Sequence, residues 1–169
     1  PPDNVLQLPE ELWHYPRWDA PIVFDSGSRF LKIGHAGEDI PRYVVPSLVA
    51  TSRTNSSKYV AGWEAKDVAL AAEEWRLGRA FDALDPDWDL ALAAWEHAYG
   101  LLEADSSQLP VMLTETPDMS IQGREEMLQI FFEYFNAPAV MIKNRSPHSS
   151  ALPAALTPRQ RADGAVRDR

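Results

Sequence analysis

The sequence predicts an α/β fold whose elements follow the order βββ-α-β-α-β. Between residues 22 and 49, three strand-like apolar segments alternate with polar turns, as in an antiparallel meander. From residue 88 to residue 102, apolar side chains recur at three- and four-residue intervals, which indicates an amphipathic helix. A short apolar strand at 111–114, a second helix and a last strand at 139–142 complete the order.

The first strand and the turn after it carry the most chemistry. Residues 22–24 are a largely β-branched apolar run suited to a buried strand, and Asp25 follows them. Gly27 permits a tight turn with positive φ, Ser28 brings a hydroxyl and a backbone N–H, and Lys32 returns on the next strand. A phosphate tail with its metal uses such a set: backbone and hydroxyl donors, one cation, and one acid for the metal's water shell. The alternative interpretation is an ordinary polar hairpin turn.

The middle of the chain is less regular. Residues 50–58 are a polar loop by composition, and residues 67–75 favour a helix. The acidic, proline-containing segment 85–87 predicts the start of the 88–102 helix. We expect the apolar face of that helix to join the core rather than to bind a cofactor. The face consists of Leu92, Trp95, Tyr99 and Leu102.

The last helix is bounded by polar residues and a proline. Asp118 or Ser120 is expected to cap its start, and the segment Asn-Ala-Pro at 136–138 stops it. Its apolar face is expected to pack against the sheet. That face consists of Met127, Ile130, Phe131 and Tyr134.

Composition narrows the function classes. The formal net charge of −9 over 169 residues argues against direct nucleic-acid binding, without excluding a local basic patch. The absence of cysteine excludes disulfides and thiolate metal sites, which fits an intracellular protein. The 4 histidines are widely spaced, so no histidine metal cluster is expected. No apolar run approaches the ~20 residues of a membrane span, so no membrane insertion is expected.

Acidic residues concentrate around the start of the 88–102 helix. One interpretation is a solvated face whose charges favour the helix N-terminus. The other is a docking patch for a basic partner. The residues are Glu73, Glu74, Asp82, Asp85, Asp87 and Asp89.

The order of several motifs resembles the opening of actin and the actin-related proteins. The segment DSGS at 25–28 is followed by KIGHAGEDIPR at 32–42 and by VPS at 45–47. A second block follows in the order that this family shows. It consists of WD at 88–89, PVMLTETP at 110–117, REEMLQIFFE at 124–133 and FNAP at 135–138. The resemblance covers residues 20–142.

The resemblance implies a ribonuclease-H-like half-domain of the actin, sugar-kinase and Hsp70 superfamily, whose first strand-turn-strand grips phosphates. It implies that Gly27 and Ser28 face the phosphate oxygens of ATP and that Lys32 neutralises them. It also implies that Asp25 holds Mg²⁺ through water. Arg29, on the same turn, is a further candidate for phosphate contact. The family's second phosphate loop and adenine-binding segment have no counterpart, so the ATP site is expected to be incomplete and hydrolysis is not expected.

Four positions depart from the family pattern. Actins have a glycine at the position of Arg29. Three placements of the Arg29 side chain are open: contact with phosphate, filling of the site, or exposure to solvent. The loop at 51–58 lacks the longer apolar insertion that docks onto the next actin subunit, so an actin-type filament is not expected. Residues 76–81 replace a histidine-containing segment of the family. By ungapped count, Arg145 stands where the family has a water-positioning glutamine.

The predicted organisation is an N-terminal extension at 1–20, an actin-like domain at 21–145 and a disordered, non-family tail at 146–169. A reduced second subdomain is expected at 47–75. The predicted function is that of a truncated, non-polymerising actin-related protein. Its full-length parent binds ATP and acts with protein partners in a cytoskeletal or chromatin-remodelling assembly, in the cytoplasm or the nucleus. The alternatives are an ATPase or phosphotransferase of the same superfamily, and a fragment without stable function.

Overall fold

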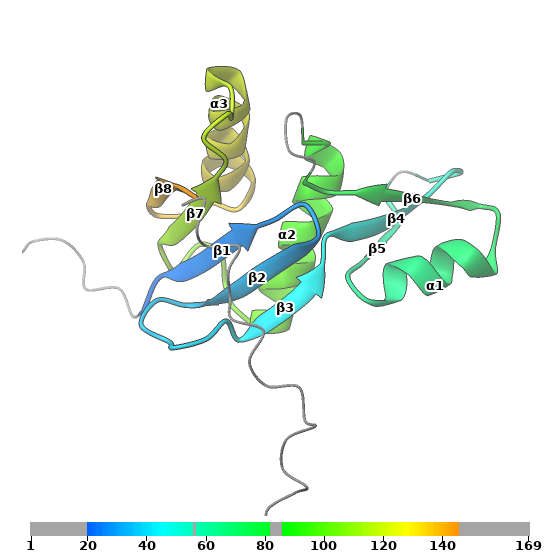
Figure 1. Ribbon diagram of the computed structural model, residues 1–169, viewed down its shortest axis with the longest axis horizontal. Coiled ribbons are helices and arrows are strands. Elements are labelled where there is room, and N and C mark those ends of the chain that lie inside the picture. The colour runs from blue at the N-terminus through cyan, green and yellow to red at the C-terminus, as the bar shows by residue number, and fades with distance from the viewer. Residues whose placement is uncertain (1–19, 56, 82–85, 146–169) are drawn as a thin grey trace, which may run out of the picture.

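The structure, a computed structural model, describes residues 20–55, 57–81 and 86–145. Its elements are β1 (Ile22–Ser26), β2 (Phe30–His35), β3 (Tyr43–Pro46), β4 (Leu48–Ser52), β5 (Tyr59–Ala61), α1 (Glu64–Ala71), β6 (Trp75–Arg79), α2 (Trp88–Leu102), β7 (Val111–Glu115), α3 (Ile121–Gln129), the π-helical turn η2 (Ile130–Tyr134) and β8 (Val140–Asn144). They form a five-stranded and a three-stranded sheet (Figure 1). Residues 1–19 of the predicted extension and the predicted tail at 146–169 lie outside the described residues.

The five-stranded sheet has the strand order β3-β2-β1-β7-β8. β1, β2 and β3 form the predicted antiparallel meander, and β7 and β8 continue the sheet in parallel on the other side of β1. The crossovers contain α2, and α3 with η2. Along this sheet the order βββ-α-β-α-β is confirmed. The parallel pairing brings β7, far along the chain, beside β1, the strand that contains Asp25.

The core lies on one face of this sheet. Ile22 and Phe24 of β1 and Leu113 of β7 are buried on that face. They pack with aromatic side chains of α2 and η2, where the rings of Trp95 and Phe131 meet edge-on with centroids 4.8 Å apart. Burial of each such side chain stabilises the fold by about 2–3 kcal/mol. We call the opposite face the outer face.

The caps and the apolar stripe of α2 follow the prediction. Asp87 caps the helix, because its carboxylate accepts a hydrogen bond from the Leu90 N–H at 3.2 Å. Trp95 and Tyr99 are buried, while the other two residues of the stripe are half-buried. For α3, the cap is Ser120, whose hydroxyl accepts from the Gly123 N–H at 2.9 Å. The stripe therefore belongs to the core, as expected.

The apolar face predicted for the last helix is wrong at one position. Met127 and Phe131 are buried, but Tyr134 is 52% exposed. The cause is η2, in which the N–H of Phe135 donates to the carbonyl of Ile130, five residues back, at 3.1 Å. The wider turn moves Phe135 to the buried position and turns Tyr134 outward.

The second sheet, of order β5-β4-β6, was anticipated only in part. The polar loop predicted at 50–58 begins as strand β4, and the helix predicted to reach residue 75 ends at Ala71. The missed strand β6 pairs antiparallel with β4, opposing Val49 to Gly78. The exposure of its side chains does not alternate as in a half-buried strand, because Arg76 and Leu77 are both exposed. A Cβ on Gly78 would lie 2.3 Å from Leu90 Cδ1, so the Leu90 side chain would have to shift to admit a larger residue where β6 meets α2.

Candidate functional site

The turn between β1 and β2 closes on a glycine. The N–H of Gly27 donates to the carbonyls of Asp25 and Phe30, both at 3.1 Å. A Cβ at Gly27 would lie 2.8 Å from the carbonyl oxygen of Phe30, closer than side chains tolerate. Gly27 is therefore required here for close approach of the backbone. The turn lies at the carboxyl end of β1, where open α/β sheets place their ligands.

Ser47, which follows β3, holds this turn from behind. Its hydroxyl donates to the carbonyl of Gly27 at 2.6 Å, and its N–H donates to the carbonyl of Arg29 at 2.9 Å. Ser47 is fully buried, so both bonds form away from water. In the sequence, Ser47 stands out only as part of the VPS motif, and no local pattern indicates that it holds the turn. Arg79, at the end of β6, donates from Nη1 to the carbonyl of Ser28 at 3.3 Å.

Asp25 lies on the outer face, opposite Lys32 in the register of β1 and β2. Its Oδ2 is 2.9 Å from Lys32 Nζ, and its Oδ1 accepts from the hydroxyl of Thr114 at 2.8 Å. Arg145 Nε lies 3.2 Å from the same Oδ1. Burial works to raise the pKa of Asp25. The hydrogen bonds from Lys32 and Thr114 and the charges of Lys32 and Arg145 outweigh it, so the pKa lies below its ordinary value.

Arg145 is positioned by the sheet. Its N–H donates to the carbonyl of Glu115 at 2.7 Å, which extends the pairing of β8 with β7 by one residue. Its Nη2 donates to the carbonyl of Ser26 at 2.6 Å. Within the described chain, Nε makes no aligned hydrogen bond, so its contact with Asp25 is an ion pair alone. A cavity of about 30 Å³, room for one water, lies beside Arg145 and the hydroxyl of Thr116.

The structure brings together some predicted site residues and separates others. Asp25 and Lys32 touch, and Gly27 shapes the turn beside them. The side chains of Ser28 and Arg29 are exposed on that turn. Glu115, the next residue of β7 after Thr114, belongs to the core face. Its buried carboxylate is bound by the guanidinium of Arg124 through two hydrogen bonds of 2.8 and 2.6 Å. Thr114 and Arg145 were not predicted to contact Asp25, because no local pattern marks residues joined only by strand pairing.

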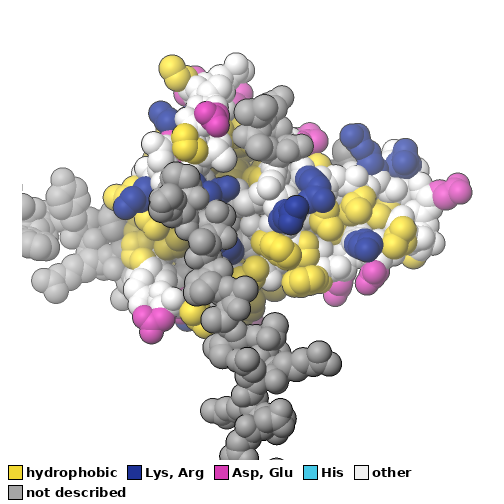
Figure 2. Space-filling view, in the orientation of Figure 1, with side chains coloured by type: hydrophobic (Ala, Val, Ile, Leu, Met, Phe, Trp, Pro, Cys, Tyr) yellow, Lys and Arg dark blue, Asp and Glu magenta, His cyan; other side chains and the backbone are white. Residues whose placement is uncertain are grey.

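Positive charge dominates the surroundings of the turn. Lys32 and Arg145 both lie within 3.2 Å of Asp25, Arg79 reaches the turn, and Arg29 is part of it. Figure 2 shows Lys and Arg side chains near the middle of this face of the molecule, where Figure 1 draws the β1–β2 turn. Cations next to a glycine-shaped backbone turn suit a phosphate group. A divalent cation is disfavoured, because two cations already occupy the carboxylate that would hold it.

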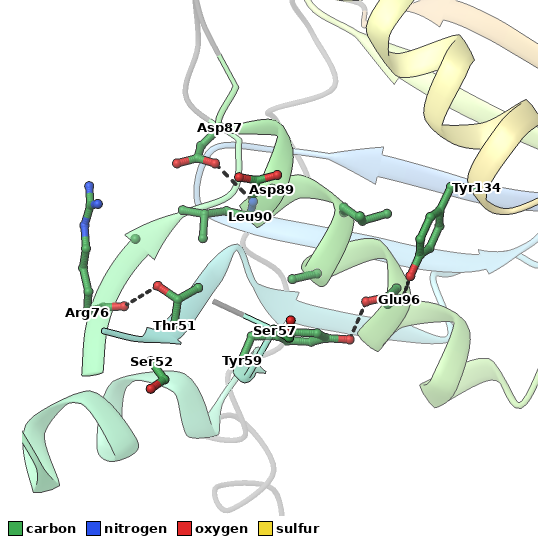
Figure 3. Close-up of a pocket in the computed structure, with 13 residues that line it drawn as sticks. Thr51, Ser52, Ser57, Tyr59, Arg76, Asp87, Asp89, Leu90, Glu96 and Tyr134 are labelled. Atoms are coloured by element: carbon green, nitrogen blue, oxygen red, sulfur yellow. Dashed lines mark hydrogen bonds between the residues drawn. The ribbon is translucent and has the colours of Figure 1, made fainter. Parts of the chain in front are cut away.

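A larger cavity, about 610 Å³, lies away from the turn, between α2 and the second sheet (Figure 3). The carboxylate of Glu96 points into it and accepts hydrogen bonds from the hydroxyls of Tyr59, at 2.6 Å, and Tyr134. Asp87 and Asp89 of the acidic cluster line the same cavity. Asp82 and Asp85 lie outside the described residues. Asp87 is engaged as a helix cap, which accounts for one acidic residue of the cluster by local structure.

Other chemistry is sparse in the described part of the chain. It contains no group of three or more His, Asp or Glu side chains arranged to hold a metal ion. His97 is half-buried, and burial lowers its pKa while Glu64 acts in the opposite direction. None of the helices described is both long enough and apolar enough to span a bilayer.

Comparison with known proteins identifies the family. The family model described as Actin matches residues 19–154. Actin-related protein 2 of Caenorhabditis briggsae is 30% identical over 130 residues, which cover 72% of this chain and 33% of the relative. The chain thus spans about a third of the length of that curated relative. It belongs to the actin family, and it matches the N-terminal portion of an actin-related protein.

Proposed function

We propose that this chain is the phosphate-binding portion of a non-polymerising actin-related protein, and that its β1–β2 turn binds the phosphates of ATP. One observation carries the proposal: the backbone closes at Gly27 directly beside the Asp25–Lys32 pair. Membership of the actin family supports ATP as the ligand, since that family generally binds ATP. The activity and partners of the whole protein are part of the proposal.

The turn offers phosphate several kinds of donor. Ser28 contributes an exposed hydroxyl, and Arg29 an exposed guanidinium that can pair two phosphate oxygens. Lys32 bonds Asp25, and its side chain is 27% exposed, so an incoming anion can still reach it. Ser47 keeps the turn in this shape before the ligand arrives. Binding is expected to be weak, with a Kd on the order of millimolar, because the phosphates stay solvated on one side.

The proposed activity is binding rather than hydrolysis. Hydrolysis of ATP needs a group that accepts a proton from the attacking water or orients it. Arg145 stands where a water-positioning glutamine was expected, and its guanidinium offers no acceptor. That guanidinium is also engaged with Asp25 and with the carbonyl of Ser26.

Two features support a partner-bound role in a cytoskeletal or chromatin-remodelling assembly, in the cytoplasm or the nucleus. β4 and β5 are joined by the polar residues 53–58, with no apolar segment of the kind that links actin subunits. Beside the phosphate turn, Phe30 and Val44 of the outer face are 43% and 44% exposed, and Trp63, which precedes α1, is 65% exposed. The rings of Phe30 and Trp63 lie 6.3 Å apart. Contiguous exposed apolar surface of this kind is typical of protein–protein contact.

Thermal unfolding of the full chain tests phosphate binding, with ATP, tripolyphosphate and adenosine each present in excess. At ten times Kd, ATP is expected to raise Tm by about 3–6 °C. Tripolyphosphate is expected to act like ATP, and adenosine to leave Tm unchanged, because the phosphates supply the contacts. Lys32→Ala should abolish the shift, whereas Lys66→Ala on the exposed side of α1 should retain it. A shift by adenosine equal to that of ATP, or an unchanged shift in Lys32→Ala, would contradict the proposal.

Assembly is tested by sedimentation and by affinity capture from cell extract. In a pelleting assay, the chain is expected to remain in the supernatant under the salt conditions in which actin forms filaments. In sedimentation velocity, it is expected to give a single boundary of a discrete species. Trp63→Ser is expected to reduce capture of partners, because it removes the most exposed ring of the apolar surface. Leu70→Ser, at a separate exposed apolar position on α1, is the matched control. Pelleting of the chain with itself would contradict the non-polymerising role.

A further inference from the structure

We propose that Arg145 supplies the positive charge that a divalent metal would bring to this site, so that the β1–β2 turn binds polyphosphate without Mg²⁺. The inference rests on the proposed phosphate binding at the same turn and specifies its counter-charge. It departs from the expectation that Asp25 holds Mg²⁺ through water.

The carboxylate of Asp25 has no oxygen left without a partner. Both oxygens of Asp25 are engaged: Oδ2 with Lys32 Nζ at 2.9 Å, and Oδ1 with the Thr114 hydroxyl at 2.8 Å. Arg145 Nε adds a charge 3.2 Å from Oδ1. One carboxylate thus serves two cations and a hydroxyl. A hydrated Mg²⁺ placed here would meet a site whose local charge is already positive, which raises the free energy of binding a dication.

Among the residues that the structure describes, no further carboxylate is placed to offset the positive charge around Asp25. Magnesium is usually held by one or two carboxylates together with substrate phosphates. The nearest acidic residue of β7, Glu115, lies on the core face and binds Arg124 through both oxygens. In the described part of the chain, no three acidic or histidine side chains converge as a metal site would require.

Arg145 is held in place by two hydrogen bonds to the ends of neighbouring strands. Its backbone N–H is bound to Glu115 of β7, and its Nη2 is bound to the carbonyl of Ser26, the last residue of β1. The guanidinium therefore sits between the ends of two strands, with its side chain 25% exposed. A guanidinium fixed at the edge of the turn attracts phosphate oxygens by its charge, and its planar N–H groups can donate hydrogen bonds to them.

Calorimetric titration of the full chain tests the inference without any substitution. Tripolyphosphate and ATP are titrated once in EDTA and once with excess Mg²⁺. The Kd in EDTA is expected to equal the Kd in Mg²⁺ within about twofold, or to be lower, because Mg²⁺ neutralises the ligand's charge before it reaches a cationic site. Binding that needs Mg²⁺, or that weakens about tenfold in EDTA, overturns the inference and leaves the proposed function standing. No binding in either buffer overturns both.

Variants then assign the effect to Arg145. Arg145→Gln should weaken binding in EDTA about tenfold, and Mg²⁺ should recover part of the loss, since the dication no longer meets the guanidinium. Arg145→Lys should keep binding within about threefold, because it keeps the charge without the fork. Arg53→Gln, at an exposed arginine between β4 and β5, is the control and should match the parent chain. Unchanged binding of Arg145→Gln in EDTA contradicts the role given to this residue.

Discussion

The indole Nε1–H of Trp95 donates a hydrogen bond to the hydroxyl of Ser26 at 3.1 Å. Trp95 is almost fully buried in α2, and Ser26 is the last residue of β1, immediately before the glycine of the β1–β2 turn. The bond therefore links the rigid core to the site, and the position of the turn depends on the packing of a helix that begins more than sixty residues later.

Removing that link is expected to destabilise the chain. Ser26→Ala leaves the indole N–H buried without an acceptor, and the unfolding free energy should fall by about 1–3 kcal/mol. Ser28→Ala, two residues away on the exposed part of the turn, should change it by less than about 0.5 kcal/mol. Urea denaturation followed by tryptophan fluorescence measures both. Equal effects of the two substitutions would show that the bond contributes nothing specific.

The same substitution at two glycines is expected to have opposite effects. Gly27→Ala places a Cβ 2.8 Å from the Phe30 carbonyl, so the turn must open, and stability should fall by about 1–3 kcal/mol. Gly100→Ala, in α2, meets nothing within 4 Å and should raise stability by up to about 1 kcal/mol. Denaturation midpoints of the two variants and the parent provide the comparison. A stable Gly27→Ala chain with unchanged phosphate binding would contradict the close approach described for this turn.

Acid is expected to weaken the fold through Asp25. Although burial raises the pKa of Asp25, the hydrogen bonds from Lys32 and Thr114 and the nearby charges hold it below its ordinary value. The ionised carboxylate therefore stabilises the folded chain at neutral pH. This stabilisation is fully present above the unfolded-state pKa of about 3.9 and is lost as pH falls through the lower, folded-state value.

Urea denaturation between about pH 5 and pH 2 measures this loss. Asp25→Asn should be less stable than the parent at neutral pH, because Lys32 and Arg145 lose their counter-charge, and its stability should fall less in acid. Asp39→Asn, at an exposed aspartate, should keep the parent's pH dependence. Parallel curves for the parent and Asp25→Asn would show that Asp25 does not contribute to acid sensitivity.

Loss of either partner of the ion pair on the core face is expected to cost a different amount of stability. Glu115 is 4% exposed and the side chain of Arg124 is 44% exposed. Arg124→Met strands a buried carboxylate and should be the more destabilising of the two substitutions. Glu115→Gln leaves an arginine that can turn to water, and should cost about 1–2 kcal/mol. Urea denaturation of the parent and the two variants at neutral pH measures both costs, and equal costs would contradict this account.

Local patterns predicted the parts of the fold that depend on near neighbours. The first strand, the cap at Ser120 and the buried ring of Trp95 all follow from residues a few positions apart. Tyr134 escaped prediction because one π-helical turn changes the spacing on which a helical face is counted. β6 escaped because its side chains do not alternate and its pairing with β4 supplies the stabilisation.

The sequence by itself determined the α/β class, the order of elements along the five-stranded sheet, the family, and the presence of Asp25 and Lys32 on consecutive strands, only seven positions apart. Tertiary structure alone decided what else surrounds that carboxylate. Thr114 contacts Asp25 across 89 positions, and Arg145 reaches Ser26 across 119. Such contacts depend on which strands lie side by side and in which register, and a one-residue shift would turn these side chains to the other face. For that reason the candidate phosphate turn was readable in the chain, while the charge that surrounds it was not.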